Sequence, residues 1–128
     1  MAERQLVLVD TSVFIHFFRG KDVPEFESLV EENRAVLSQF VRLELMMGVR
    51  KSELNAVASA LSGLIQSVHH PEICSVAEDI LSKLRPKGIT IGTIDLLLAA
   101  EANINGHAII SYDKVFNKMA SMGLIRTI

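Results

Sequence analysis

The 128-residue sequence contains one cysteine and no tryptophan. A single cysteine, Cys74, excludes an internal disulfide bond. No other cysteine or histidine lies near it at zinc-finger spacing, because the pair His69 and His70 stands alone. We therefore expect Cys74 to be a small, buried, hydrophobic residue on a helix.

Long apolar segments are also missing. No apolar run approaches the roughly 18 residues that span a bilayer, and the N-terminus enters a predicted strand without a signal-peptide pattern. We expect a soluble, cytoplasmic protein with no membrane partner.

Charge of either sign is not in large excess. The formal net charge is −2, from 13 basic and 15 acidic residues, and does not by itself indicate a nucleic-acid-binding protein. If four of the acids bind cations, 11 acidic residues remain against the 13 basic ones. Small basic groups then become candidates for contacts with phosphates; they are Arg19 with Lys21, Arg50 with Lys51, and Lys83 with Arg85 and Lys87.

Hydrophobic residues make up 49% of the chain and the mean hydropathy is +0.32, which is enough to fill one core. We expect a single domain over residues 1–128. Strands are predicted at 6–9, 35–37 and 107–111, with a last edge strand at 124–128. Helices are predicted at 13–18, 24–33, 39–47, 52–68, 73–84, 94–104 and 115–122. This alternation favours an α/β fold, with a parallel sheet covered by helices on both faces.

Four carboxylates occupy notable places in this pattern: Asp10, Glu44, Asp95 and Asp113. Asp10 ends the first strand and Asp113 follows the strand at 107–111, so both fall at the carboxyl edge of the sheet, where open α/β sheets bind ligands. Glu44 and Asp95 lie among helical apolar residues, where burial of an isolated charge costs several kcal/mol. A bound cation would offset that cost.

Oxygen ligands without histidine or thiolate partners favour Mg²⁺ or Mn²⁺ over zinc. Such ions commonly serve phosphodiester hydrolysis, and the hydroxyls of Ser12 and Ser111 are close enough in sequence to support the acids. Each acid also has a simpler interpretation. Asp10 is a candidate helix cap, Glu44 a partner for Arg42 or Lys51, Asp95 a favourable charge in a first helical turn, and Asp113 a turn residue.

At these positions the sequence resembles the PIN domain family, and most closely its VapC toxin branch. Four segments carry the resemblance: Val9-Asp10-Thr11-Ser12-Val13-Phe14-Ile15, Arg42-Leu43-Glu44-Leu45-Met46-Met47-Gly48, Asp95-Leu96-Leu97-Leu98-Ala99-Ala100 and Ser111-Tyr112-Asp113-Lys114-Val115-Phe116. They occur in order and at the family's spacing, so the resemblance covers nearly the whole chain.

The resemblance implies a three-layer α/β/α fold with four to five parallel strands. It also implies a Mg²⁺- or Mn²⁺-dependent endoribonuclease, the toxin of a type II toxin–antitoxin module, in which Asp10, Glu44, Asp95 and Asp113 are the catalytic and metal-binding acids. Ser12 and Ser111 would support them. A homodimer and a separate antitoxin chain, whose extended tail crosses the active site, are implied as partners. Many relatives carry a further acid just before the third segment, where Gly92-Thr93-Ile94 supplies none, so one or two metal ions remain open.

Other functions compete with this one. A haloacid-type phosphatase needs a second acid two residues after Asp10, where Ser12 stands, and a receiver-type phosphoacceptor needs a paired acid close to Asp10. An RNA-processing PIN nuclease and a PIN-like binding module without catalysis also stay open. As a hypothesis, Arg19 and Lys21 hold the RNA backbone. The four histidines are expected to be structural.

Overall fold

The computed structural model describes residues 4–128. Residues 1–3 lie outside the described residues. They include part of the predicted domain and of the N-terminus that we expected to lack a signal peptide. The described chain forms five strands: β1 (Val7–Val9), β2 (Ala35–Leu37), β3 (Ile65–Gln66), β4 (Ala108–Ile110) and β5 (Arg126–Thr127). It also forms seven α-helices: α1 (Thr11–Phe18), α2 (Pro24–Glu31), α3 (Gln39–Gly48), α4 (Leu54–Ser62), α5 (Ile73–Leu84), α6 (Thr93–Asn105) and α7 (Lys114–Ser121). Two 3-10 turns, Lys51–Glu53 and Arg85–Lys87, precede α4 and follow α5.

All five strands are parallel, in the order β3-β2-β1-β4-β5. The chain builds outward from β1 through β2 to β3, and then crosses back to place β4 on the other side of β1. The strand order therefore reverses between β1 and β4. In open α/β sheets this is the position at which loops part and a ligand site forms beyond the carboxyl ends of the strands.

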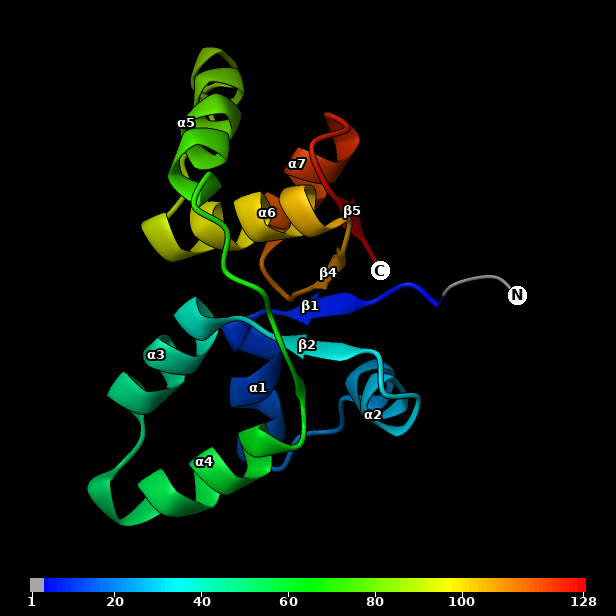
Figure 1. Cartoon of the computed structure of the whole chain (residues 1–128), viewed down its shortest axis with the longest axis vertical. Coiled ribbons are helices and arrows are strands. Elements are labelled where there is room, and N and C mark those ends of the chain that lie inside the picture. Colours follow the sequence, from blue (N-terminus) through cyan, green and yellow to red (C-terminus); the bar gives the residue numbers. More distant parts are fainter. Residues whose placement is uncertain (1–3) are drawn as a thin grey trace.

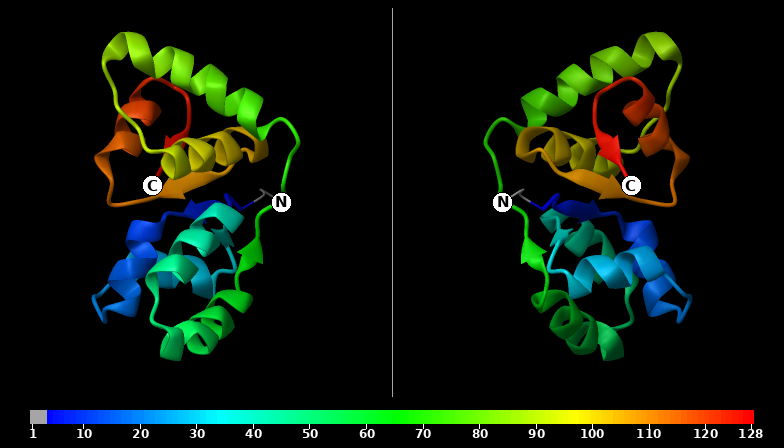
Figure 2. Two further views of the ribbon diagram at one scale, coloured as in Figure 1. Left: turned by 90° about the vertical axis from the view of Figure 1, so that its left-hand side faces the viewer. Right: turned by 90° about the vertical axis from the view of Figure 1, so that its right-hand side faces the viewer.

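Helices cover the sheet on both faces. Every residue of β1, β2 and β4 is buried, as expected for central parallel strands. Figures 1 and 2 show α1 to α4 gathered around the half of the molecule that contains β2 and β3, and α5 to α7 around the half that contains β4 and β5. Helices α3 and α6 also contact each other across these halves. The predicted three-layer α/β/α fold with a parallel sheet of four to five strands is confirmed.

The sequence prediction was wrong for one segment. The expected helix 52–68 ends at Ser62, and Ile65–Gln66 forms the edge strand β3 instead. The apolar residues at 64, 65 and 68 continue the helical spacing of α4, but Gly63 caps the helix, and Ser67 extends the pairing with β2 through its N–H to the Leu37 carbonyl. Tertiary pairing here overrides a helical pattern.

Cys74 is on a helix, as predicted, but it is exposed rather than buried. The buried face of α5 consists of Ile73, Ala77, Ile80 and Leu84, and Cys74 lies one position away from this stripe. None of the helices in residues 4–128 has the length and apolar composition of a membrane span.

Candidate functional site

The carboxylate of Asp10 is buried at the end of β1, with 4% of its surface exposed. Its Oδ2 accepts hydrogen bonds from Ser12 Oγ at 2.8 Å and from Ser111 Oγ at 2.7 Å. The Asp10 N–H extends the β1–β4 ladder to the Ile110 carbonyl at 3.0 Å. Backbone pairing and two hydroxyls thus fix a buried carboxylate beside the reversal point of the sheet.

Asp95 lies in the first turn of α6 and is half-buried. The pKa of its carboxyl is raised from 3.8 to about 7, first by desolvation, then by the charges of Asp10 and Asp113, by hydrogen bonding to Asp113 and by the charge of Glu44. The charges of the other three predicted acids therefore all act on the pKa of Asp95, so the four residues share one electrostatic site.

Glu44 lies in the middle of α3, as predicted, but its side chain is exposed, so its expected burial was wrong. The buried face of α3 is formed by Val41 and Leu45, and Glu44 points away from that face toward α1. Its Oε1 accepts a hydrogen bond from the hydroxyl of Thr11. This bond links Glu44 to the residue that directly follows Asp10.

Asp113 caps α7, because its Oδ1 accepts a hydrogen bond from the Val115 N–H at 3.0 Å. Asp113 is therefore a turn and capping residue, as the simpler interpretation of the sequence predicted. It also takes part in the electrostatic site, since its charge raises the pKa of Asp95. The Ser111 hydroxyl joins the two ends of this loop by accepting from the Asp113 N–H at 2.9 Å while it donates to Asp10.

Basic residues do not neutralise these acids. The ion pairs found in residues 4–128 are Arg34–Glu32, Lys83–Asp79 and His70–Glu72, and none involves the four carboxylates. Asp10 makes no side-chain cap to α1, so the capping interpretation of this residue does not hold. Among residues 4–128, the four acids thus form no ion pair with a basic side chain.

The donor set fits a hard divalent cation, since it consists of carboxylate and hydroxyl oxygens. Within the described range, no group of three or more Asp, Glu, His or Cys side chains is already arranged to hold a metal ion. Like charges hold carboxylates apart, and Mg²⁺ keeps several waters rather than requiring a closed protein cage. Desolvation first, and then the charges of the other acids, raise the pKa of Asp95, so nearby positive charge would favour its ionised form.

A groove of about 620 Å³ leads away from Glu44 between α1 and α3. Thr11 and Glu44 line its end near the acids, and Arg19 and Arg50 line the end further along both helices. Lys21, predicted together with Arg19, is not among the residues that line this groove. Arg19 and Arg50 therefore line the same groove as Glu44, together with one further acid, Glu53.

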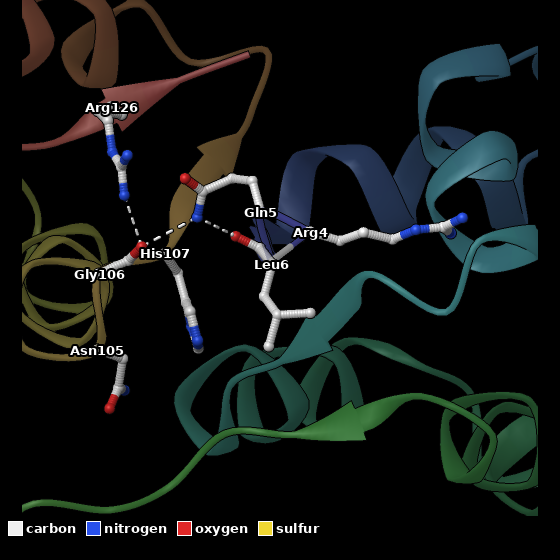
Figure 3. A pocket seen from close by; sticks show the side chains of 7 residues that line it. All are labelled: Arg4, Gln5, Leu6, Asn105, Gly106, His107 and Arg126. Atoms are coloured by element: carbon white, nitrogen blue, oxygen red, sulfur yellow. Dashed lines mark hydrogen bonds between the residues drawn. The ribbon is translucent and has the colours of Figure 1, made fainter. Parts of the chain in front are cut away.

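A second pocket, of about 520 Å³, lies at the amino edge of the sheet, far from the acids (Figure 3). Its polar groups already stabilise the end of α6. The carbonyl of Gly106 accepts from Gln5 Nε2 at 2.9 Å and from Arg126 at 2.7 Å, while Arg4 points away toward the Glu32 carbonyl. We interpret this pocket as structural.

Two of the four histidines have hydrogen-bond partners that their sequence positions do not reveal. His70 Nε2 lies 2.7 Å from Asn105 Oδ1. His16 Nδ1 lies 2.9 Å from the Ser12 carbonyl, and its ring lies against Tyr112, with ring centroids 4.5 Å apart. Burial lowers the pKa of His107. His16 is thus close to the acid site, although its hydrogen bond is structural.

Sequence reasoning missed Thr11 and Tyr112 as neighbours of the site. Thr11 lies inside the first motif and was visible there, but its bond to Glu44 spans 33 positions along the chain. Tyr112 stands between Ser111 and Asp113, and only the folded loop shows that its N–H reaches Ser12 Oγ at 3.1 Å.

Comparison with known proteins gives consistent results. The PIN domain family model matches residues 7–122. Ribonuclease VapC19 of Mycobacterium tuberculosis is 28% identical over 98 residues, which cover 74% of this chain and 78% of that protein. The DNA-bound VapBC structure from Salmonella typhimurium superposes with a TM-score of 0.83 at 20% identity, covering 98% of each chain. VapBC-5 of M. tuberculosis, from the VapBC family of toxin–antitoxin systems, gives a TM-score of 0.72 at 17% identity, again covering 98% of each chain.

Proposed function

Because the chain belongs to the PIN domain family, we propose that it is a divalent-metal-dependent endoribonuclease that acts as the toxin of a type II toxin–antitoxin module. The observation that carries this function is the family match over residues 7–122, within which the carboxylate of Asp10 is fixed by Ser12 and Ser111 at the reversal point of the sheet. The similarity to Ribonuclease VapC19 supports RNA as the substrate. The similarity to VapBC toxin–antitoxin structures supports the antitoxin as a partner.

Asp10, Glu44, Asp95 and Asp113 would hold Mg²⁺ or Mn²⁺, with Asp10 fixed by Ser12 and Ser111. A bound divalent cation supplies Lewis-acid stabilisation of the charge that develops when water attacks an RNA phosphodiester. The protein contributes placement. Two serine hydroxyls orient Asp10, Thr11 orients Glu44, and the cap of α7 orients Asp113.

Arg19 and Arg50 would contact RNA phosphates in the groove that leads away from Glu44. Lys21 stays a proposed phosphate contact from its position in the sequence. The family match over residues 7–122 supports one domain across residues 1–128. We further propose that the protein acts in the cytoplasm as a homodimer. Exposed apolar residues on α3, Leu43 at 58% and Met47 at 79%, are candidates for its interface.

The test is cleavage of total cellular RNA by purified protein freed of antitoxin, in Mg²⁺ or Mn²⁺. Discrete fragments that disappear with EDTA and with Asp10→Asn and Asp95→Asn variants are the expected result. Asp79→Asn, an exposed aspartate on α5 that pairs with Lys83, is the matched control and should cleave normally. Sequencing of the fragment ends would identify the target RNA.

Equal RNA cleavage by the wild-type protein and by the acid variants would contradict the proposed nuclease activity. If the wild-type protein then still bound Mn²⁺ in titration calorimetry, a PIN-like binding module would replace the nuclease. A toxin should be inhibited by an antitoxin encoded beside it. If no protein encoded beside this one inhibits its RNA cleavage, an RNA-processing nuclease is favoured over a toxin.

A further inference from the structure

Exposed Tyr112 and partly buried His16 form an aromatic pair beside the acid site. Their ring centroids are 4.5 Å apart, with an interplanar angle of 46°. Tyr112 is the only tyrosine of a chain without tryptophan, and 48% of its surface is exposed. Tyr112 packs against His16 but leaves 48% of its surface in solvent, so it offers aromatic area to a ligand.

Both residues are hydrogen-bonded to one residue of the acid site, Ser12: His16 through its ring and Tyr112 through its backbone N–H. The Ser12 carbonyl accepts a hydrogen bond from His16 Nδ1 at 2.9 Å, and Ser12 Oγ accepts from the Tyr112 N–H at 3.1 Å. The same Oγ donates to Asp10 Oδ2 at 2.8 Å. The position of the aromatic pair is therefore tied to the position of the buried carboxylate.

The chemistry of the site favours a nucleobase on this pair. A bound cation would hold the phosphate to be cleaved, but the acids repel other phosphates, and within the described residues none of the ion pairs found provides a positive side chain beside them. A base is neutral and has a π-face, so it can stack on an aromatic ring without regard to the negative field. Recognition of unpaired RNA commonly uses such stacking on tyrosine and histidine.

We propose that Tyr112, supported by His16, is a stacking platform for one unpaired RNA base next to the bond to be cleaved. This role depends on the proposed ribonuclease activity and adds the nature of its substrate contact. Tyr112 lies between Ser111, which binds Asp10, and Asp113, so a base on its ring belongs to a nucleotide close to the reacting phosphate. Single-stranded RNA is then preferred over a duplex, whose bases already stack on each other.

The kinetic test compares Tyr112→Ala, Tyr112→Leu and Tyr112→Phe on one single-stranded RNA. Stacking predicts that Phe keeps the KM within about twofold, whereas Ala and Leu raise it by about tenfold or more, with kcat little changed. Leu is the control for apolar area without a π-face. Circular dichroism melting shows that each variant is folded.

A spectroscopic test uses tyrosine emission, which reports on Tyr112 alone. In an Asp95→Asn background with Mg²⁺, where we expect no cleavage, a short oligoadenylate should quench this emission saturably. The same strand paired with oligouridylate should quench it far less.

Unchanged KM in Tyr112→Ala and Tyr112→Leu, or unchanged emission at oligoadenylate concentrations that saturate binding by anisotropy, would overturn the platform. A loss of kcat without a change in KM would overturn it too, because it would show that Tyr112 only maintains the loop. In each of these cases wild-type cleavage still supports the ribonuclease. Absence of wild-type cleavage on every RNA would instead reject the proposed enzyme itself.

Discussion

Ser111 Oγ donates a 2.7 Å hydrogen bond to Asp10 Oδ2, across 101 positions of the sequence. The bond joins the residue that follows β4 to the residue that follows β1, at the point where the strand order reverses. Ser12, in the first turn of α1, donates to the same oxygen, so Asp10 is held by residues that follow both β1 and β4. The orientation of this carboxylate therefore depends on the pairing of β1 with β4, which brings the two serines together.

We predict that Ser111→Ala weakens the site without destroying it. Loss of one hydrogen bond to a carboxylate should lower the free energy of unfolding by about 1–2 kcal/mol, because Ser12 still donates. Loss of an orienting partner should lower Mn²⁺ affinity by about tenfold. Urea denaturation and titration calorimetry measure the two effects. Ser82→Ala, which removes an exposed hydroxyl from α5, is the control and should change neither.

The raised pKa of Asp95 predicts how stability depends on pH in the absence of metal. The pKa is about 7 in the folded protein against 3.8 for an ordinary aspartate, so the folded state binds a proton more tightly than the unfolded chain. This contribution to stability is fully present below pH 3.8 and is lost as pH rises toward about 7. Metal-free Asp95→Asn should lack this loss and should melt a few degrees above the wild type near about pH 8.

Thermal melts in EDTA across this pH range test the effect, and Asp79→Asn is the exposed control. Excess Mg²⁺ should stabilise the wild type at alkaline pH more than it stabilises Asp95→Asn, because the cation offsets the charge that the variant lacks. If the melting temperatures of the wild type and of Asp95→Asn depend on pH in the same way, the other acids do not raise the pKa of Asp95.

The hydroxyl of Thr11 gives a third prediction. Thr11→Val keeps the shape of the side chain but removes the hydrogen bond to Glu44, so Glu44 should lose its fixed orientation. We expect cleavage to fall by about tenfold, as for other groups that orient a metal ligand. Thr11→Ser retains the hydroxyl and should keep most of the activity. Equal rates for the Val and Ser variants would show that Glu44 needs no such support.

Much of the fold follows from patterns along the chain. The central strands are continuous apolar runs, and Asp10 and Asp113 fall at their ends, so a parallel sheet brings these acids to one edge whenever β1 and β4 are neighbours. Sequence could not fix that adjacency. It also failed at Ile65, whose helical spacing is correct but whose backbone pairs with Val36. Strand pairing is a contact between distant residues, and local periodicity does not contain it.

For the site, too, the sequence predicts the identity of the residues but not their packing. Residue type and spacing identify four carboxylates, but they do not show which of them is buried. Asp10 is nearly inaccessible because it directly follows the buried strand β1, whereas Glu44 is exposed because α3 buries Val41 and Leu45 instead. The contacts from Thr11 to Glu44 and from Tyr112 to Ser12 come from the same long-range packing.

Arg19 and Arg50 are predicted to act on RNA binding through charge. Both line the groove that starts at Glu44, whereas Lys21 does not line it. Arg19→Glu with Arg50→Glu should raise the KM for RNA several-fold and reduce its dependence on salt, since fewer phosphates are neutralised. Lys21→Glu tests the alternative from the sequence, in which Lys21 rather than Arg50 acts together with Arg19, and we expect it to change the KM little. If Lys21→Glu has the larger effect, the RNA follows a different path.

Ser67 and Glu101 provide a prediction that separates stability from activity. Glu101 is a carboxylate with 3% of its surface exposed in α6, and its Oε1 accepts from Ser67 Oγ at 2.6 Å. Its Oε2 is buried without a partner in the described structure. Ser67→Ala removes the hydroxyl and leaves a buried, unpaired acid, which should cost about 2–3 kcal/mol of unfolding free energy.

The double variant Ser67→Ala with Glu101→Met should recover most of that loss, because a buried polar pair can be replaced by an apolar side chain of similar volume with little net cost. Ser62→Ala, whose hydroxyl bonds a helix carbonyl at the surface, is the control. Urea denaturation measures the stabilities, and cleavage per folded molecule should stay unchanged in every variant, since Ser67 and Glu101 take no part in the acid site. Failure of the double variant to regain stability would mean that the hydroxyl, and not the unpaired charge, holds α6 against the β3 edge.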